Sequence, residues 1–351
     1  MKKEKILIFN ISTDSNNTSL GFAINWLNQL SEYYIEIDVV TLNKGASHIL
    51  KDNINVYSYD SVNLNRLTKF IALRKIIKNL IKNNEYKFCL SHMTTSLTLV
   101  SSTIFRFQNL QSILWYTHKG PTTSVKKIVL YLAALFSDKI ITASENSFPL
   151  KFKNVTSIGH AINYDDFFRS RINLKSKDFL ILSRISKSKN IDESIQGFLN
   201  SVYGESQIIT IVGGPLTKQD AAYEDYLKNK YSEYRNIRFA GSVPHADIST
   251  YLDETGFHIN NTPMGFYDKS VLETLSGGII NFYMNSEYDK NIHPEYINIL
   301  KFDGTKDTLT KSINLISELE NDLLVEIIRF SQEKVKDESL KTLHHRILKV
   351  I

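Results

Sequence analysis

The sequence predicts an α/β protein that consists of two doubly wound parallel sheets in tandem. Apolar runs of strand length alternate with segments of helical periodicity almost from end to end, which is the pattern of parallel βαβ units. This rhythm loosens around residues 154–177 and then starts again, so each half accounts for one sheet. The length of 351 residues agrees with two domains, because it exceeds what one hydrophobic core usually organises.

The expected strands follow one another in chain order, with helical segments between them. Segment 20–32 illustrates the helical pattern, because Trp26, Leu27 and Leu30 share one face. Apolar runs of the first half predict strands at residues 5–11, 35–42, 53–59, 87–91, 112–117 and 139–143. Those of the second half predict strands at residues 178–183, 207–212, 236–240, 256–260, 278–284 and 298–302. Three helical stretches close the chain, and the last spans residues 340–351.

The domain boundary is expected near Phe168, where the periodic pattern is weakest and several cations crowd together. This boundary predicts an N-terminal domain of residues 1–168, joined by the C-terminal helix 340–351, and a second domain of residues 169–339. Open α/β sheets bind ligands at the carboxyl ends of their strands. Two such edges that face each other would form a deep cleft between the domains.

Composition excludes several classes of protein. The single cysteine, Cys89, rules out a disulfide framework and a cysteine-based metal site, and it favours a reducing compartment such as the cytoplasm. The N-terminus reads as a first strand, not as a signal peptide. The longest apolar run, residues 128–136, is far shorter than the roughly 20 residues of a membrane-spanning helix. A formal charge of +5 without a basic motif argues against nucleic acid as a partner.

The sharpest local signal is a pair of cations, Arg184 and Lys189, between an expected strand and a helix that begins near Ile191. A guanidinium and an ammonium at such a turn can converge on one diphosphate, and the helix N-terminus adds partial positive charge. A solvated basic loop is the alternative, and for Lys187 we prefer that alternative.

A second signal is the glycine turn at Gly265, which leads into a short helix that carries Glu273. A carboxylate in this position can accept hydrogen bonds from two ribose hydroxyls, as the acidic residue of dinucleotide-binding folds does. The alternative is a glutamate that merely interacts favourably with the positive end of its helix.

Together these segments resemble the retaining GT-B glycosyltransferases of family 4, also called the glycosyl transferases group 1. Residues 183–189 resemble the GR-x(4)-K phosphate clamp, although Ser183 replaces its usual glycine. Residues 265–278 resemble the E-x(7)-E region. Further similarities are the IVG-x-GP turn at 211–215, shortened by one residue, the base-reading strand and loop at 236–243, the NGVD linker at 159–163 and the strand-end His-Gly at 115–120.

The resemblance covers essentially the whole chain and implies two Rossmann-like domains that face each other across a cleft. The C-terminal domain would hold the nucleotide-sugar donor and the N-terminal domain the acceptor. The matching positions assign catalytic roles to Arg184, Lys189 and His118. They assign donor binding to Gly213, Gly214, Gly241, Ser242, Val243, Gly265, Phe266, Asp268, Lys269 and Glu273. Gly21 and His92 would lie in the N-terminal loop region or on the acceptor side.

The sequence departs from the family pattern at two places. Counting back eight residues from Glu273 reaches Gly265, so the first glutamate of the E-x(7)-E pair is absent, while the same loop offers Asp268 and Lys269. The paired-glycine turn after the first strand is reduced to Gly21. Donor-sugar recognition therefore has less support than nucleotide binding.

The histidines allow more than one interpretation. His118 could donate a hydrogen bond to the transferring sugar or its phosphate, or it could be a satisfied strand-end residue, and the resemblance favours the first role. For His92 the two interpretations are even. We expect His160 to be structural and the adjacent His344 and His345 to lie on the surface.

No D-x-D motif and no clustered metal ligands occur in the sequence, so we expect neither a metal site nor a cofactor beyond the nucleotide-sugar co-substrate. Positive charge on the leaving diphosphate would then come from Arg184, Lys189 and backbone dipoles. The resemblance implies front-face displacement, in which the leaving phosphate takes the proton of the acceptor.

The sequence thus predicts a retaining glycosyltransferase that moves a sugar from a nucleotide diphosphate sugar to a glycan, a lipid-linked acceptor or a small hydroxylic acceptor. Surface polysaccharide or glycolipid biosynthesis is the expected setting. Two alternatives stay open: a GT-B protein that binds nucleotide without transferring sugar, and a sugar-nucleotide epimerase on the same scaffold.

Residues 66–82 alternate cations with apolar residues. A basic amphipathic helix can lie on the cytoplasmic face of an anionic membrane and bring an enzyme to a lipid-linked acceptor. An ordinary core-packed helix with a solvated basic face shows the same pattern, and we place this interpretation somewhat ahead.

Overall fold

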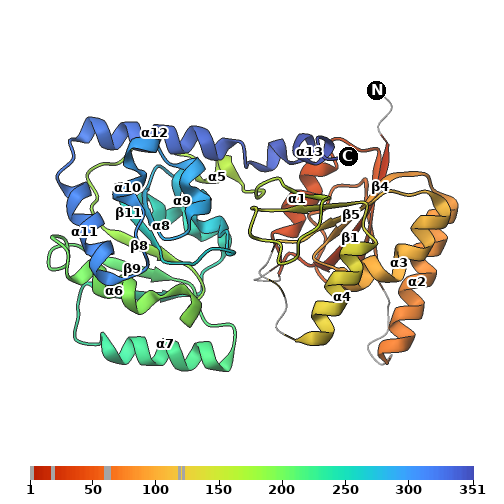
Figure 1. Ribbon diagram of the computed structural model, residues 1–351, viewed down its shortest axis with the longest axis horizontal. Coiled ribbons are helices and arrows are strands. Elements are labelled where there is room, and N and C mark those ends of the chain that lie inside the picture. The colour runs from red at the N-terminus through yellow and green to blue at the C-terminus, as the bar shows by residue number, and fades with distance from the viewer. Residues whose placement is uncertain (1–3, 17–19, 59–64, 118–119, 121–122) are drawn as a thin grey trace. The chain divides into compact units, whose positions relative to one another are not determined.

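The computed structural model describes residues 4–16, 20–58, 65–117, 120 and 123–351. The chain divides into two compact units, an N-terminal unit of Met1–Ala161 with Leu340–Ile351 and a C-terminal unit of Ile162–Ser339. Each unit contains one parallel sheet with its helices (Figure 1). The division lies within the linker segment 159–163, seven residues before the boundary expected at Phe168.

The sheet of the N-terminal unit is parallel throughout its described strands, in the order β3-β2-β1-β4-β5-β6-β7. Its strands are β1 (Lys5–Thr13), β2 (Glu36–Lys44), β3 (Ile54–Tyr57), β4 (Tyr86–His92), β5 (Ser112–Trp115), β6 (Lys139–Thr142) and β7 (Val155–Ser157). The six strands predicted for this half are present, and β7 is an addition. Its three residues are partly or fully exposed, so they leave no apolar pattern in the sequence.

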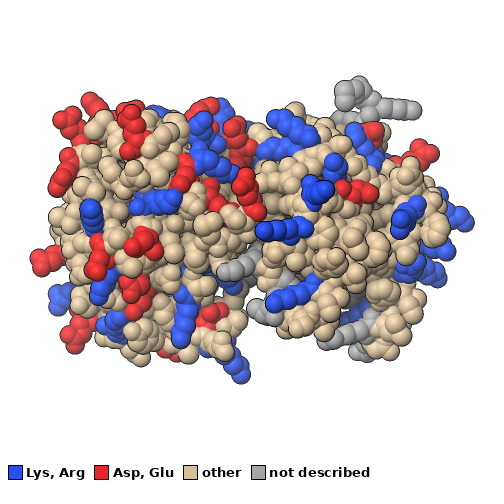
Figure 2. Space-filling view, in the orientation of Figure 1, with Lys and Arg blue, Asp and Glu red and all other residues tan. Residues whose placement is uncertain are grey.

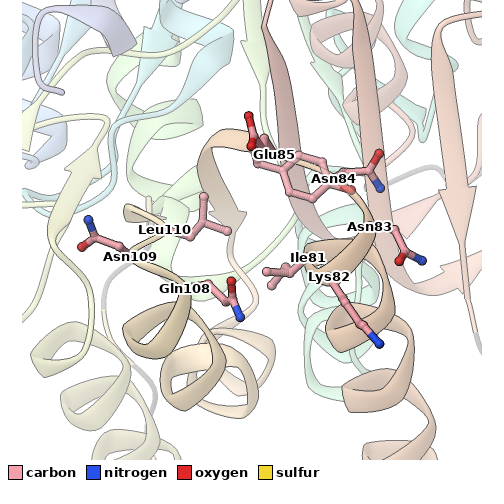
Figure 3. A pocket seen from close by; sticks show the side chains of 9 residues that line it. Ile81, Lys82, Asn83, Asn84, Glu85, Gln108, Asn109 and Leu110 are labelled. Carbon is pink, nitrogen blue, oxygen red and sulfur yellow. The ribbon is translucent and has the colours of Figure 1, made fainter.

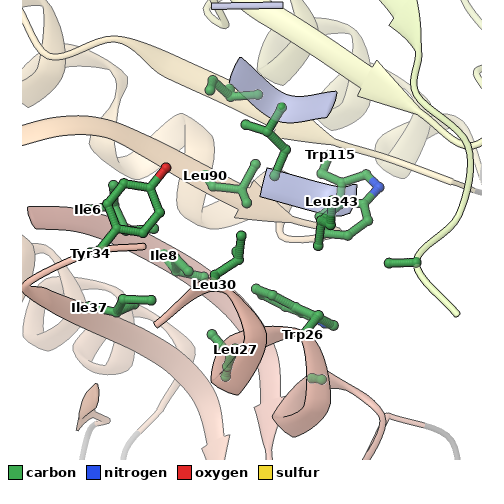
Figure 4. Packing of buried hydrophobic residues seen from close by; sticks show 14 of the residues in the cluster. Ile6, Ile8, Trp26, Leu27, Leu30, Tyr34, Ile37, Leu90, Trp115 and Leu343 are labelled. Carbon is green, nitrogen blue, oxygen red and sulfur yellow. The ribbon is translucent and has the colours of Figure 1, made fainter. Parts of the chain in front are cut away.

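The helices of this unit are α1 (Ala23–Leu30), α2 (Arg66–Asn83), α3 (Thr95–Gln108), α4 (Ser124–Leu135) and α13 (Leu340–Leu348). Alternate residues of β1 belong to two different cores. Ile6 and Ile8 pack with Trp26 of α1 and Leu343 of α13 (Figure 4), whereas Leu7 on the other face belongs to the core beneath α2 and α3. The last helix of the chain is therefore part of the N-terminal core.

The sheet of the C-terminal unit has the order β10-β9-β8-β11-β12, and all its described pairs are parallel. Its strands are β8 (Phe179–Leu182), β9 (Ile209–Val212), β10 (Ile237–Gly241), β11 (Phe257–Asn260) and β12 (Ile280–Tyr283). The order reverses between β8 and β11. This reversal is a topological switch point, where the loops after neighbouring strands diverge and leave room for a ligand.

Helices pack on both faces of this sheet. Phe179 of β8 contacts Phe198 of α6, whereas Leu180 packs with Ile248 and Leu252 of α8. The helices are α5 (Tyr164–Phe167), α6 (Ile191–Leu199), α7 (Lys218–Lys230), α8 (Ile248–Asp253), α9 (Lys269–Ser276), α10 (Ile297–Leu300), α11 (Lys306–Ser317) and α12 (Asn321–Lys336). Short 3-10 turns add η1 (Lys187–Lys189), η2 (His245–Asp247), η3 (Ser286–Asn291) and η4 (Pro294–Tyr296). The three closing helical stretches are confirmed as α11, α12 and α13.

The strand predicted at residues 298–302 is wrong. The structure forms α10 there, directly after η4, and only Lys301 makes an isolated parallel bridge, to Tyr283. A run as short as Ile-Asn-Ile-Leu suits either a strand or a helical turn, and Pro294 at the start of η4 favours the helical turn.

One of the two histidines of the closing helix also differs from expectation. His344 does not lie free on the surface, because its ring stacks on Tyr33 with 4.0 Å between the ring centroids. Burial lowers the pKa of His344 to about 4. His345, by contrast, is exposed as expected.

Candidate functional site

The candidate site lies at the carboxyl ends of β8 and β11, on the two sides of the switch point. After β8 the chain passes through η1 into α6, and after β11 it passes through residues 261–268 into α9. The predicted phosphate clamp belongs to the first of these connections and the predicted ribose-binding glutamate to the second. The topology therefore brings together two segments that the sequence separates by about eighty residues.

Lys189 and Asp268 form a buried ion pair across the switch point. The Lys189 Nζ lies 2.8 Å from Oδ1 and 2.6 Å from Oδ2 of Asp268, and the Lys189 side chain is only 6% exposed. Asn260 and Thr262 also donate hydrogen bonds to Oδ2 of Asp268. Burial by itself would raise the pKa of Asp268, but Lys189 and these donors outweigh it and hold the pKa below its ordinary value. Lys189 is thus fixed in position by a charged partner.

Arg184, the other predicted clamp residue, has a different environment. Its side chain is exposed and makes no ion pair or hydrogen bond with another residue of the described chain. Lys187 on η1 is also exposed, as the solvated interpretation expects. Of the two predicted clamp residues, Arg184 is therefore the one whose charge stays uncompensated in the described structure.

The glycines after β9 stand where neighbouring strand ends approach closely. A Cβ on Gly213, which has a φ of +137°, would lie 1.9 Å from the carbonyl oxygen of Ser183 after β8. A Cβ on Gly214 would lie 2.3 Å from Oγ of Ser242 after β10. The Gly213 N–H donates to the Gly241 carbonyl oxygen at 2.8 Å. Only residues without a side chain let these three strand ends meet.

Glu273 lies on the second turn of α9 and is paired with a histidine. Its side chain is 6% exposed, and its Oε1 lies 3.0 Å from Nε2 of His245 on η2. The ring of His245 packs edge-on against Phe167, with 5.4 Å between the centroids. The hydrogen bond to Glu273 raises the pKa of His245 above its ordinary value, although burial opposes this effect.

The contacts at the start of α9 show whether the side chain of Asp268 caps this helix or has another partner. Asp268 occupies the N-cap position, but its side chain makes no capping hydrogen bond and turns to Lys189 instead. Lys269, the first residue of the helix, is half-buried. Burial lowers the pKa of Lys269 to about 8, while the charge of Glu273 acts in the opposite direction. Gly265 has a φ of +89°, so the turn before the helix requires a glycine.

The remaining donor-side positions lie at the same edge. Ser242 and Val243 follow β10 directly, and Val243 packs against the buried cluster of this unit. Phe266 lies beneath the clamp lysine, whose Nζ is 5.5 Å from the centre of the ring. The sequence did not point to His245, which occurs three residues after Ser242; its place behind a strand end is the signal that could have found it.

In the N-terminal unit, His92 ends β4 beside the switch point between β1 and β4. Its Nδ1 lies 3.4 Å from Oδ1 of Asn10, and its buried ring packs against Trp26 and Trp115. This aromatic packing favours the structural interpretation of His92. Gly21 lies in the turn before α1 and accepts a hydrogen bond from Ile24. The predicted catalytic residue His118 lies outside the described residues.

The described part of the chain also contains a pocket of about 510 Å³, lined by the C-terminal ends of α2 and α3 and the residues that follow them (Figure 3). Lys82, Asn84 and Tyr86 lie on its α2 side, and Gln108 and Leu110 on its α3 side. This pocket lies at the amino ends of β4 and β5. It is thus at the edge opposite to the one where open α/β sheets bind their ligands.

The family model described as "Glycosyl transferase 4-like" matches residues 15–144 of the chain. No curated protein sequence matches this chain. Among solved structures, the Anabaena protein Alr3699/HepE in complex with UDP and glucose is similar, with a TM-score of 0.72 and 15% identity over 99% of this chain and 100% of that chain. A glycosyltransferase from Rickettsia africae ESF-5 aligns with a TM-score of 0.77 and 14% identity over 100% of this chain and 98% of that chain. Sucrose-phosphate synthase (tll1590) from Thermosynechococcus elongatus aligns with a TM-score of 0.72 and 12% identity over 99% of this chain and 98% of that chain.

These similarities confirm the GT-B fold and the resemblance to the family-4 glycosyltransferases. The fold and the family match together define the class of the protein, which is that of the glycosyltransferases.

Proposed function

We propose that this glycosyltransferase binds a nucleoside diphosphate sugar at the carboxyl edge of the C-terminal sheet and transfers the sugar with retention of configuration. The observation that carries the proposal is the set of groups at the β8–β11 switch point. It comprises an uncompensated guanidinium at Arg184, a buried ammonium at Lys189 and a carboxylate at Glu273. Because HepE is similar in fold and was solved with UDP-glucose, a uridine nucleotide is the first donor to test.

In the proposed reaction the hydroxyl oxygen of the acceptor forms a bond to the anomeric carbon while the bond from that carbon to the diphosphate oxygen breaks. The departing phosphate oxygen takes the acceptor proton, so no protein base is needed. Negative charge develops on the leaving diphosphate, where Arg184 supplies an exposed guanidinium and Lys189 supplies an ammonium that Asp268 holds in place. Donors held in place before the reaction stabilise such charge without reorganisation.

Asp268 has a revised role in this proposal. Both of its carboxylate oxygens bind Lys189, and Oδ2 also accepts from Asn260 and Thr262, so the group is occupied by protein partners. We therefore propose that Asp268 positions Lys189, instead of binding the donor sugar directly. Lys269 at the start of α9 then adds a third cation near the ribose-binding carboxylate.

One observation favours the alternative of a protein that binds nucleotide but does not transfer sugar. Position 265 holds a glycine where the E-x(7)-E pair has its first glutamate. The experiment that separates the two measures UDP-glucose turnover by the purified chain in the presence and absence of hydroxylic acceptors, beside a melting curve with UDP. A ligand at 100 times its dissociation constant stabilises a protein by about 2.7 kcal/mol. Transfer supports the proposal; stabilisation without any turnover would support the binding protein.

We also propose that a lipid-linked acceptor is reached through α2. Leu73 and Ile77 of this helix are buried in the core, whereas Leu67, Phe70 and Ile71 are exposed by 69%, 44% and 57%. Figure 2 shows Lys and Arg side chains gathered over this part of the N-terminal unit. A basic helix with an exposed apolar patch suits the surface of an anionic membrane. No helix in the described ranges is long and apolar enough to cross one.

Co-sedimentation with vesicles that contain anionic lipid tests this second proposal. Replacing Phe70 and Ile71 by Ser should release the protein from the vesicles. Replacing Val202 and Leu216 by Ser is the matched control, because both are similarly exposed apolar residues of the C-terminal unit. Equal binding by the two variants would contradict the proposal.

A further inference from the structure

The carboxylate expected to bind the ribose is covered in the described structure. The Glu273 side chain is 6% exposed, whereas two ribose hydroxyls can reach a carboxylate only if its oxygens are open to them. Among the described residues, His245 is the one that hydrogen-bonds to the carboxylate of Glu273, with 3.0 Å between Nε2 and Oε1. A nucleoside and this imidazole would therefore compete for the same oxygen.

His245 is placed so that it can give way. It begins the three-residue turn η2, and its side chain is 48% exposed although its partner is buried. Its other ring contact is the edge-on packing against Phe167. A rotation of this side chain toward solvent would free Oε1 of Glu273 without displacing a residue of the hydrophobic core.

We propose that His245 is a latch on the nucleotide site. It occupies the ribose-binding carboxylate of Glu273 in the empty protein, and it must leave that carboxylate before a nucleoside can bind. The inference rests on the proposed function, because it takes Glu273 as the ribose acceptor. It adds a residue that sets the affinity for the nucleotide and makes this affinity depend on proton concentration.

The dependence follows from the charge of the histidine. A protonated imidazole holds the Glu273 carboxylate by a charge-assisted hydrogen bond, which is stronger than the bond from a neutral imidazole. The other charged groups near His245 are Lys269 on α9, which opposes protonation, and Asp166 on α5, which favours it. Asp247 belongs to the same turn, and Asp253 of the adjoining α8 is paired with Arg169.

The sign of the effect can be derived from the pKa of His245. Glu273 raises this pKa in the empty protein, and the pKa falls back toward its ordinary value when a ribose displaces the imidazole. The empty protein therefore holds its proton more tightly, and acid favours the empty state. As the pH falls from the higher to the lower of the two pKa values, His245 should weaken nucleotide binding by up to about tenfold per pH unit. Above the higher pKa value this effect of His245 should no longer change with pH.

The test measures UDP-glucose binding by calorimetry between pH 5.5 and 7.0, below the pKa of about 8 of the neighbouring Lys269. UDP-glucose is chosen because its diphosphate is esterified at both ends and does not titrate in this range. We expect the wild type to lose affinity as the pH falls, and His245→Ala to bind more tightly than the wild type at low pH with a flat profile. His245→Gln, which keeps a neutral donor, should also be flat. His293→Gln is the control, because His293 forms a comparable pair with Glu326 elsewhere in this unit.

A second readout needs no nucleotide. The pKa of His245, followed by NMR of the ring in the empty protein, should fall in Glu273→Gln. An unchanged pKa would overturn the latch, as would UDP-glucose binding whose pH profile is the same in the wild type and His245→Ala. Absence of UDP-glucose binding at every pH, with the NMR shift as expected, would instead overturn the proposed uridine donor and the nucleotide role of the latch with it.

Discussion

Replacing Asp268 by Asn tests whether the ion pair at the switch point holds the site together. The substitution keeps the shape of the side chain and removes its charge. Lys189, which is 6% exposed, then stays buried without a charged partner. Breaking a buried ion pair from one side costs about 3–5 kcal/mol. Because Asp268 is 20% exposed, we expect a loss toward the lower end of this range.

The measurement is urea denaturation of the wild type, Asp268→Asn, Lys189→Met and the double variant. If the pair is coupled, the double variant loses clearly less stability than the sum of the two single losses. Asp268→Asn should also depress transfer, because Lys189 loses its fixed position. A midpoint equal to that of the wild type, or strictly additive losses, would refute the reasoning and reopen a direct contact between Asp268 and the sugar.

Three further predictions follow from the same site and from the fold. Arg184→Ala should lower transfer by about 10²- to 10³-fold, because it removes a cation that stabilises the developing anion. Lys187→Ala should have little effect, because Lys187 is exposed on the solvated side of the turn. Equal losses of steady-state turnover in the two variants would mean that the register of the clamp is wrong. Transfer should survive excess chelator, since the clamp relies on protein cations, and an activity that returned only with manganese or magnesium would count against it. Leu343→Ala on α13 should lower the free energy of unfolding of the N-terminal unit by about 2–5 kcal/mol, because Leu343 is fully buried against α1 and the sheet; an unchanged denaturation curve would show that α13 does not stabilise this core.

Much of the fold could be predicted because buried parallel strands leave apolar runs that are easy to recognise. The failures occurred where this signal is weak. The strand β7 has three residues with little burial, and the segment at 298–302 is too short for its periodicity to distinguish a strand from a helical turn. The stacking of His344 on Tyr33 was missed because it depends on a contact between residues about three hundred positions apart.

In the candidate site, too, some features could be predicted from the sequence and others could not. The types of residue at the strand ends and their spacing pointed to Arg184, Lys189, Gly213 and Glu273. The partners of these residues could not be predicted, because the Lys189–Asp268 and His245–Glu273 pairs form only when separate loops meet at one edge of the sheet. The resemblance assigned Asp268 to donor binding, whereas the structure turns its carboxylate to Lys189.

In the empty protein, both pairs occupy side chains that are expected to bind the nucleotide sugar. Lys189 is paired with the opposite charge of Asp268, and Glu273 is hydrogen-bonded to His245 from another element. The Lys189 side chain is buried, and its pairing with Asp268 fixes a cation in place, whereas Glu273 has a half-exposed partner that can leave. We therefore expect Asp268 to act through stability and position and His245 through competition with the nucleotide.

The central claim, that the carboxyl edge of the C-terminal sheet binds a nucleoside diphosphate, is tested most directly by calorimetric titration with UDP, GDP and ADP. The wild type, Arg184→Ala, Glu273→Ala and Lys187→Ala are titrated at one pH above 7.5, where the latch is weakest. The account predicts that at least one nucleotide binds the wild type and Lys187→Ala equally well and binds Arg184→Ala and Glu273→Ala at least about tenfold more weakly, which is a loss of about 1.4 kcal/mol. Binding of none of the three nucleotides, or binding with equal affinity to all four proteins, would contradict it.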